Sequence, residues 1–243
     1  MLAIVLFFII AFVAAAVASL TGFGSATLLI PFAGLVIDLK QAIILVAFFH
    51  FFSNAFKLLR LRQSVNWRLM RLYGVPSIVT AYAGAMLLDR VNVEIISIAF
   101  ASFIIVYALY SLINPSWSLP DKNGVLVFGG ALSGFTAGLI GLGGAIRSMF
   151  LISTKIKKEA YIATSAAIAV VVDITRLSVY VFNGSLDARY YWYIAPLIVI
   201  AFLGTSLGVK LLIRLPETVV KRSVLILLIL VGIRMLLSQY GIF

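Results

Sequence analysis

Cysteine is absent from this chain of 243 residues, and histidine occurs only once, as His50. Without cysteine the sequence cannot form disulfides, attach haem through thioether bonds or bind metals through thiolates. A single histidine cannot build a metal site from several imidazoles. We therefore expect no metal site and no cofactor.

Charged side chains are also scarce, at 11% of the residues, whereas 63% of the residues are hydrophobic and the mean hydropathy is +1.17. A soluble domain has roughly 45–50% apolar residues. Apolar runs of about 20 residues, the length needed to cross a bilayer core, recur along the whole chain. The sequence therefore predicts an all-α, polytopic membrane protein.

The net charge of +11 does not indicate nucleic-acid binding, because most of the lysines and arginines fall in short loops between apolar runs. Basic residues in such loops orient membrane helices, since they stay on the cytoplasmic side. We expect the lipid bilayer as the surroundings of this chain and no nucleic-acid partner.

The two halves of the chain align with each other at an offset of about 119 residues, with slips of one residue in loops. Glycines and prolines fall at matching positions: Gly22-Phe23-Gly24 with Gly141-Leu142-Gly143, Pro76 with Pro196, and Gly84 with Gly204. We therefore predict two membrane repeats, 1–113 and 124–243, joined by a polar linker, 114–123.

Each predicted repeat has an interrupted apolar segment followed by three apolar helices. The first repeat has the interrupted segment 2–37 and helices at 41–60, 70–89 and 93–113. The second repeat has the interrupted segment 124–153 and helices at 159–182, 190–212 and 218–238. Both repeats thus follow one plan.

The basic residues decide whether each interrupted segment crosses the membrane or turns back within it. If both segments turn back as re-entrant hairpins, twelve basic residues lie in the cytoplasm: Arg60, Arg62, Arg68, Arg71, Lys122, Lys155, Lys157, Lys158, Lys210, Arg214, Lys221 and Arg222. Three then lie outside: Lys40, Arg90 and Arg189. If both segments cross, six lie inside and nine outside, which inverts the positive-inside bias. We therefore predict two re-entrant hairpins, each followed by three transmembrane helices, with the second repeat inverted relative to the first.

Glycines and other small residues interrupt both hairpins and are predicted to form their tips. The tip residues expected to bind substrate are Thr21, Gly22, Phe23, Gly24 and Ser25 in the first hairpin, and Gly141, Leu142, Gly143 and Gly144 in the second. Glycine lets the backbone turn tightly and approach a ligand. A helix that restarts after each turn, near Ser25 and near Gly144, offers free N–H groups to an anion. The alternative is that the small residues only let helices pack closely.

Two pairs of polar residues lie inside predicted helices. Asp173 and Arg176 are three residues apart on one helical face, and Asn54 and Lys57 hold the equivalent positions in the first half. Ionisable groups in hydrocarbon are costly and suggest a function inside the bundle. We expect Asn54 and Arg176 to bind substrate, and Asp173 and Lys57 to take part in coupling. The alternatives are a structural Asp173–Arg176 pair that neutralises itself and a Lys57 that extends to the interface.

His50 and Arg147 complete the candidate site. His50 lies among four phenylalanines and could titrate near neutral pH and carry a coupling proton; the alternative is a packed, hydrogen-bonded histidine. Arg147 follows the second tip closely, where a cation suits an anionic substrate, and it could equally be a topology signal.

The sequence carries no pattern of ordinary catalysis. The H-E-x-x-H zinc motif, the G-x-S-x-G nucleophile elbow and the phosphate-binding G-x-x-x-x-G-K-[ST] loop are all absent. We therefore expect no enzyme, although an intramembrane enzyme and a non-transporting membrane subunit remain as alternatives from other classes.

The glycine-rich breaks resemble those of the TauE/SafE family of sulfite and organosulfonate exporters. The resemblance rests on Thr21-Gly22-Phe23-Gly24-Ser25 with Pro31 after it, on Gly138-Leu139-Ile140-Gly141-Leu142-Gly143-Gly144, and on the duplicated layout with a polar second helix in each half. It covers nearly the whole chain. Ser25 and Ala26 replace glycines of the family's fuller G-x-G-G-G pattern, and Ala145 ends the glycine run in the second half.

The resemblance implies export of small sulfur-containing anions across a bacterial inner membrane without ATP hydrolysis. Together with the predicted inverted repeats, it indicates a multi-pass secondary transporter that works by alternating access. The expected partners are a small anionic substrate, a coupling proton or cation, and a second copy of the chain as a homodimer. An anion channel is the alternative within the transport class.

Overall fold

The computed structural model describes residues 2–21, 24–34, 36–114, 120–152, 154 and 156–211, and isolated positions between 219 and 237. Every regular element in these residues is helical. Six helices are long and apolar enough to cross a membrane: Leu39–Ser64, Trp67–Arg90, Ile95–Ile113, Asn123–Ile140, Glu159–Phe182 and Ala188–Lys210. The predicted all-α, multi-pass membrane protein is thereby confirmed.

The first half contains a broken helix pair and then three long helices. Its elements are α1 (Leu2–Thr21), α2 (Ser25–Ala33), α3 (Leu39–Leu61), α4 (Trp67–Leu69), a π-helical segment (Met70–Gly74), α5 (Val75–Leu87) and α6 (Val93–Ile113). Short 3-10 turns follow α3 at Arg62–Ser64 and α5 at Leu88–Arg90. The helices predicted at 41–60 and 93–113 are confirmed as α3 and α6. Helix α3 begins two residues early because Oδ1 of Asp38 accepts from the backbone N–H of Gln41 (3.2 Å).

The second half repeats this order as far as the structure describes it. Its elements are α7 (Asn123–Ile140), α8 (Gly143–Ile152), α9 (Lys158–Phe182), a 3-10 turn (Ala188–Tyr190) and α10 (Tyr191–Leu211). The helices predicted at 159–182 and 190–212 correspond to α9 and α10. The helix predicted at 218–238 falls mostly outside the described residues, and its described positions are helical.

The helix predicted at 70–89 differs from the structure at its start. The helical run begins at Trp67, where the side chain of Asn66 accepts from the backbone N–H of Leu69 (3.2 Å). It then widens into the π-helical segment just before Pro76. Proline has no N–H to donate and its ring crowds the preceding turn, so a wider turn accommodates it without breaking the helix.

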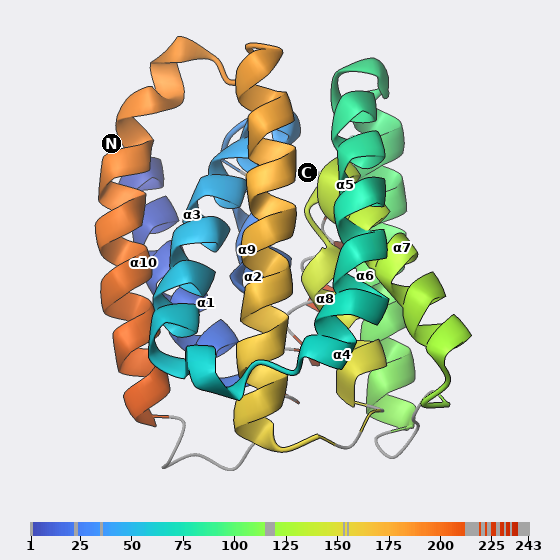
Figure 1. Cartoon of the computed structure of the whole chain (residues 1–243). Coiled ribbons are helices and arrows are strands. Elements are labelled where there is room, and N and C mark those ends of the chain that lie inside the picture. Colours follow the sequence, from blue (N-terminus) through green and yellow to red (C-terminus); the bar gives the residue numbers. More distant parts are fainter. Residues whose placement is uncertain are drawn as a thin grey trace.

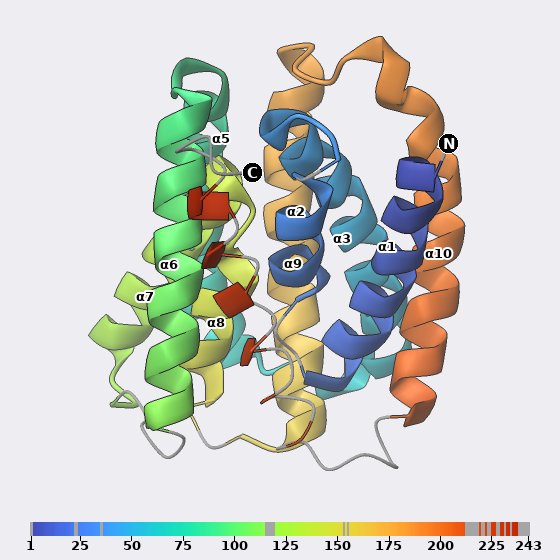
Figure 2. The ribbon, with the colours of Figure 1, turned by 180° about the vertical axis from the view of Figure 1, so that it is seen from behind.

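The helices of the two halves interleave (Figures 1 and 2). Helix α1 packs against α10, α7 packs against α5, and the long helices α3 and α9 pack against each other in the centre. Glycines allow two of these contacts: a Cβ on Gly84 would lie 2.2 Å from the carbonyl oxygen of Phe135 on α7, and one on Gly204 would lie 2.7 Å from that of Phe12 on α1. Each hairpin thus rests on a helix of the other half.

Hydrogen bonds show which loops share an end of the bundle. At one end Gln41 donates to the carbonyl of Ser185 (3.1 Å) and accepts from the N–H of Asp187 (2.9 Å). At the other end the N–H of Asn66 donates to Oγ1 of Thr164 (2.8 Å), and Arg68 lies at the same end. In Figure 1, α7 starts at the lower end and the N-terminal end of α1 lies nearer the upper one. Helices α1 and α7 therefore begin nearer opposite ends of the bundle.

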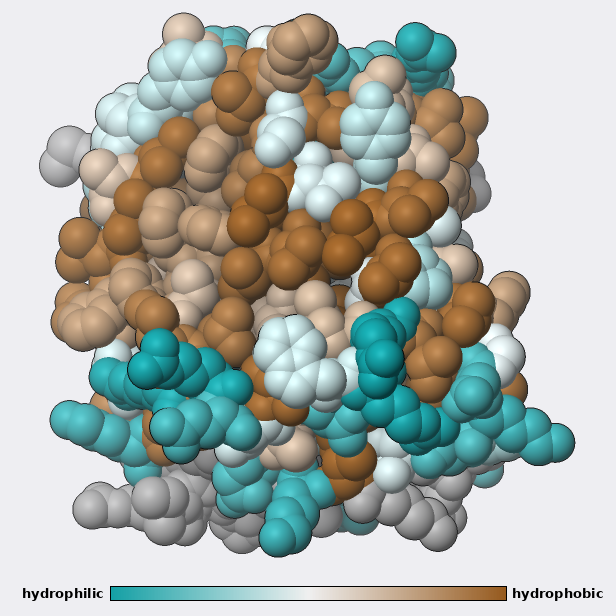
Figure 3. All heavy atoms as spheres, viewed as in Figure 1, coloured by the Kyte–Doolittle hydropathy of each residue, from teal (hydrophilic) through white to brown (hydrophobic). Residues whose placement is uncertain are grey.

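The surface agrees with a membrane setting. Figure 3 shows an apolar band across the middle of this face and strongly hydrophilic side chains gathered below it. Large apolar side chains such as those of Val79, Val106 and Phe182 are exposed. Such a broad exposed apolar surface fits contact with lipid rather than water.

Candidate functional site

The first hairpin turns between Thr21, the last residue of α1, and Ser25, the first residue of α2. Gly24 caps α2 with φ 85° and ψ 131°, a backbone conformation that side-chain-bearing residues rarely adopt. The predicted site residues Gly22 and Phe23, and the side chain of Thr21, lie outside the described structure. Gly24 and Ser25 thus represent the first tip.

The second hairpin turns at Gly141, which ends α7 in the left-handed conformation (φ 77°). Its N–H donates to the carbonyl of Ala137 (3.1 Å), and α8 restarts at Gly143. A Cβ on Gly141 would lie 2.2 Å from Cδ1 of Ile30 on α2. The second tip therefore packs directly against the first hairpin.

The two tips meet beside the histidine. A Cβ built on Gly24 would lie 3.1 Å from Nε2 of His50 on α3 and 3.4 Å from the Cα of Gly144 on α8. Three residues that the sequence analysis placed in one site are thus neighbours. Both α2 and α8 begin at this place, so their free N–H groups lie around a common point.

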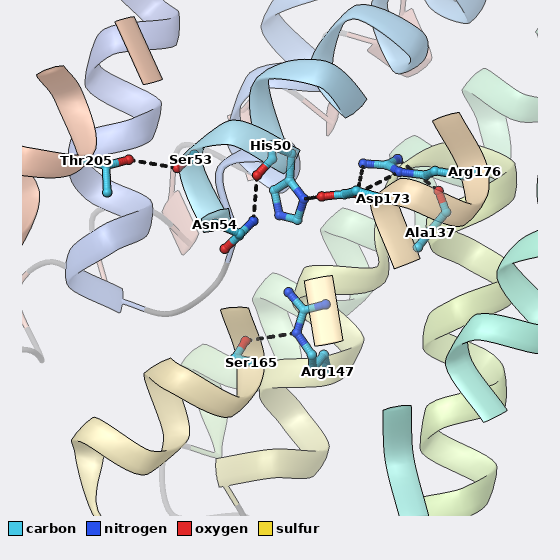
Figure 4. A network of polar contacts seen from close by, with 9 residues as sticks. All are labelled: His50, Ser53, Asn54, Ala137, Arg147, Ser165, Asp173, Arg176 and Thr205. Atoms are coloured by element: carbon cyan, nitrogen blue, oxygen red, sulfur yellow. Dashed lines mark hydrogen bonds and ion pairs between the residues drawn. The ribbon is translucent and has the colours of Figure 1, made fainter. Parts of the chain in front are cut away.

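A chain of hydrogen bonds runs from the tips into α9 and α7 (Figure 4). Nδ1 of His50 lies 2.7 Å from Oδ2 of Asp173, and the other carboxylate oxygen, Oδ1, is bound by Nε (2.8 Å) and Nη2 (2.7 Å) of Arg176. Nη1 of Arg176 donates to the carbonyl oxygen of Ala137 near the end of α7 (3.0 Å). The side chains of His50, Asp173 and Arg176 are 4%, 1% and 1% exposed. Asp173 and Arg176 thus form the ion pair that was the alternative to separate functional roles, and His50 extends it to the first tip.

Two buried polar atoms at the tips have no hydrogen-bond partner among the described residues: Nε2 of His50 and Oγ of Ser25. An unsatisfied buried polar atom costs about 1–3 kcal/mol, so such atoms are rare unless a ligand uses them. Here both belong to predicted site residues. The tips therefore carry free hydrogen-bonding capacity.

Positive charge exceeds negative charge in this interior. Among the described residues, the buried ionic side chains are Lys57, Arg147 and Arg176 against the single acid Asp173. Arg147 donates through Nε to Oγ of Ser165 (2.9 Å) and lies within electrostatic range of His50, Lys57 and Asp173. Cations buried without an equal number of anions favour an anionic ligand, because burial weakens the screening of their charge.

The remaining predicted residues have local contacts. Nδ2 of Asn54 donates to the backbone carbonyl of His50 one turn earlier (2.8 Å), and Lys57 is buried at 4% exposure rather than extended to the interface. Leu142 is fully buried. Gly143 faces its own hairpin, since a Cβ there would lie 2.5 Å from that of Ala137.

Sequence reasoning missed several supporting residues. Ser133 on α7 donates to the carbonyl of Gly143 (2.8 Å), Tyr180 on α9 donates to that of Gly138, and Ser165 holds Arg147. Tyr180 follows Arg176 by one helical turn on the same face of α9, and this spacing was the only signal in the sequence. Serines that hold a backbone carbonyl inside a hairpin leave no such pattern.

The described residues contain no cluster of three or more histidine or acidic side chains that could hold a metal ion. The polar groups gathered here are backbone amides, hydroxyls, one imidazole, the carboxylate of Asp173 and a larger number of buried cations. This set of groups suits an oxyanion, which accepts hydrogen bonds and carries negative charge.

Comparison with protein families matches residues 7–235 to sulfite exporter TauE/SafE. Searches of curated proteins and of solved structures gave no match. The family match spans both hairpins and the polar helices that carry His50, Asp173 and Arg176, and it supports a transporter rather than an enzyme. The chain belongs to the TauE/SafE sulfite exporter family.

Proposed function

We propose that this protein is a secondary transporter that exports small sulfur-containing oxyanions, such as sulfite or organosulfonates, across the inner membrane by alternating access. The family supports membrane transport of such anions. The observation that carries the proposal is the meeting of the two tips at Gly24 and Gly144, beside Nε2 of His50 and within an excess of buried positive charge.

The anion binds between the tips. Backbone N–H groups at the starts of α2 and α8 point to this place and favour negative charge. Oγ of Ser25 and Nε2 of His50 add hydrogen bonds on the first side, and Arg147 adds positive charge on the second. Arg176 orients Asp173, which in turn holds the imidazole of His50, whereas Asn54 binds the backbone carbonyl of His50 within α3.

The two halves act as inverted repeats. Helices α1, α3 and α5 of the first half correspond to α7, α9 and α10 of the second. The contact between α1 and α10 therefore has a counterpart between α7 and α5, and the contact between α3 and α10 has one between α9 and α5. All four contacts occur. Two hairpins that enter from opposite sides give the site two exchangeable routes of access, which is the basis of alternating access in transporters with inverted repeats. Helices α3, α5, α6, α9 and α10 supply the scaffold around them.

His50, Asp173 and Lys57 are the groups that respond to a coupling ion. They are buried and lie within electrostatic range of one another through Asp173, and they include the one imidazole among the described residues. Their position between α3 and α9 connects the tip of the first hairpin to the centre of the bundle.

Flux measurements in proteoliposomes test the proposal. Purified protein is reconstituted and loaded with sulfite, methanesulfonate, sulfate or chloride, and efflux is followed with and without a pH gradient. We expect saturable efflux of sulfite or methanesulfonate that exceeds chloride efflux. Ohmic conductance without saturation would instead indicate an anion channel, and absence of flux for every anion would indicate a non-transporting subunit.

A further inference from the structure

The hydrogen bonds of Asp173 determine which nitrogen of His50 carries a proton. Arg176 binds Oδ1 of Asp173 through two nitrogens, which keeps the carboxylate ionised and able only to accept. Oδ2 of that carboxylate lies 2.7 Å from Nδ1 of His50, so Nδ1 must bear the hydrogen of this bond. A neutral His50 therefore presents the lone pair of Nε2 to the tips.

This lone pair points at the place where the anion binds. Nε2 lies 3.1 Å from the Cβ position of Gly24 and has no partner among the described residues. An acceptor atom facing an oxyanion is repulsive, because both carry negative partial charge. A proton on Nε2 reverses this: the imidazolium becomes a charged donor aimed at the anion.

We propose that Nε2 of His50 is a joint site for one proton and one substrate anion, so that the protein moves the two together in a ratio of one to one. This inference rests on the proposed function and specifies its coupling ion and stoichiometry. The proton comes from bulk water on the side to which the site is open. It travels on Nε2 and leaves with the anion on the other side.

The groups around His50 make the two binding events depend on each other. Asp173 and Arg176 face it from α9, Arg147 from α8 and Lys57 from its own helix α3, whereas α2 contributes the uncharged Ser25. Helix α10 also packs on α3. There Oγ1 of Thr205 lies 2.8 Å from Oγ of Ser53, and the described part of α10 brings no charged side chain to His50. Burial and the cations oppose a positive charge on His50, the Asp173 carboxylate favours it, and an anion at Nε2 adds to the favourable side. Proton and anion therefore favour each other's binding equally, as linkage requires.

Joint binding fixes the driving force. A proton and an anion with a single negative charge are neutral together, so the membrane potential does not act on their movement. A pH difference of one unit does act, and at equilibrium it sustains about a tenfold higher anion concentration on the more alkaline side, because a factor of ten in one gradient balances a factor of ten in the other. Where the cytoplasm is the more alkaline side, net export therefore requires an outward anion gradient larger than this ratio.

Proteoliposomes loaded with methanesulfonate, which keeps its single negative charge over the whole working pH range, test this inference. A potassium gradient with valinomycin sets the potential, and buffers set the pH gradient independently. For the native chain we expect about tenfold methanesulfonate accumulation per pH unit and no response to the potential.

Two variants separate coupling from binding. In Asp173→Asn the amide can still accept from Arg176 and can donate to Nδ1, so neutral His50 would carry its hydrogen on Nε2 and bind an anion without an added proton. His50→Gln likewise offers a permanent N–H donor. Both variants should transport methanesulfonate more slowly and should no longer accumulate it in response to a pH gradient. The membrane potential should instead drive its accumulation, by about tenfold per 59 mV.

Ser53→Ala is the matched control, because it removes a buried hydrogen bond between α3 and α10 that does not touch the tips. Its accumulation ratio per pH unit should equal that of the native chain. Melting temperature and size-exclusion behaviour confirm that each variant is folded, and if neither coupling variant folds, the native chain alone decides through its response to pH and potential.

Two outcomes would overturn the accounts separately. Methanesulfonate flux in the native chain that follows the potential and ignores the pH gradient would contradict joint binding and leave the transport function standing. No flux of methanesulfonate or sulfite under any gradient would contradict the proposed function, and the inference with it.

Discussion

The two hairpin tips occupy corresponding places in the two halves but offer different chemistry. At the first tip Gly24 stands at the entrance of α2 next to Nε2 of His50 and Oγ of Ser25, two buried atoms without a partner among the described residues. At the second tip Gly141 ends α7 and is packed against Ile30; Nη1 of Arg176 lies 3.5 Å from its Cβ position, and Arg147 follows on α8.

The difference shows that a duplicated scaffold can divide one task between its halves. The first tip carries groups whose hydrogen-bonding role changes with protonation, whereas the second carries a guanidinium that is always charged. On our proposal the second tip attracts the anion at any pH and the first tip decides when it binds.

The largest effect is expected in cysteine labelling, which tests from which side of the membrane each hairpin enters. Because the native chain has no cysteine, single cysteines at the exposed positions Gln63 and Asn183 can be labelled cleanly. If the hairpins enter from opposite sides, an impermeant thiol reagent should react with the cysteine at one position only from one side of the membrane, and with the cysteine at the other position only from the opposite side. Labelling of both positions from one side would refute inversion.

The next largest effect should come from removing the positive charge of Arg147. Arg147→Gln keeps a donor near Ser165 but deletes the cation, and a hydrogen bond to a charged group contributes about 1.5–3 kcal/mol. We expect methanesulfonate flux at low concentration to fall by about a hundredfold, since 1.4 kcal/mol corresponds to a factor of ten.

Arg68→Gln is the control for this loss of charge. Arg68 is exposed, donates to Asn123 (2.8 Å) and lies 3.7 Å from Asp121 at the basic end of the bundle. A surface pair of this kind contributes about 0–1 kcal/mol, so flux should remain near that of the native chain. Equal losses in both variants would mean that overall charge, not the site, sets the flux.

Alanine at each tip glycine should separate binding from packing. Gly24→Ala places a methyl group where the anion meets His50, so flux should fall strongly while stability falls by the strain of a positive φ with ψ 131°, about 1–3 kcal/mol. Gly141→Ala carries the strain of the left-handed region, about 1–2 kcal/mol, and also forces Ile30 to move, so its melting temperature should fall further.

Gly184→Ala isolates the strain. Gly184 also has a positive φ (64°), and nothing lies within 4 Å of a Cβ there. Its melting temperature should fall by the strain of a positive φ alone, and its flux should not change. If Gly24→Ala transports as well as Gly184→Ala does, the first tip is not the binding site.

Ser25→Ala should give the smallest effect. Its hydroxyl has no partner among the described residues, so removing it costs little stability or even adds some. The loss of one hydrogen bond to the charged anion, about 1.5 kcal/mol at the lower end for such bonds, should raise the methanesulfonate concentration needed for half-maximal flux about tenfold. Ser19→Ala removes a hydroxyl already bonded to the carbonyl of Ala15 on its own helix (2.8 Å) and provides the comparison.

Much of the fold followed from patterns that the bilayer imposes. Long apolar runs gave the helices, because a spanning segment must satisfy its own backbone. Glycines marked both breaks, since only glycine adopts the positive φ observed at Gly24 and Gly141 without strain. The π-helical widening before Pro76 was not predicted, because it depends on how the neighbouring helices tolerate the missing N–H.

The site was harder to predict than the fold. Asp173 and Arg176 share a helix, so their pairing could be read from spacing. The bond from His50 to Asp173 spans 123 residues of sequence and arises only from the packing of α3 on α9. Ser133 and Ser165 gave no signal, because a serine that stabilises a hairpin or an arginine has no distinctive spacing.

Access to the first tip is the most direct test of the central claim that the two tips enclose an alternately exposed anion site. A Ser25→Cys variant is treated with a sulfonate-bearing methanethiosulfonate reagent from one side or the other, with and without methanesulfonate. We expect modification from either side, competition between the two sides and protection by methanesulfonate. Modification from one side only, unaffected by methanesulfonate, would contradict the account.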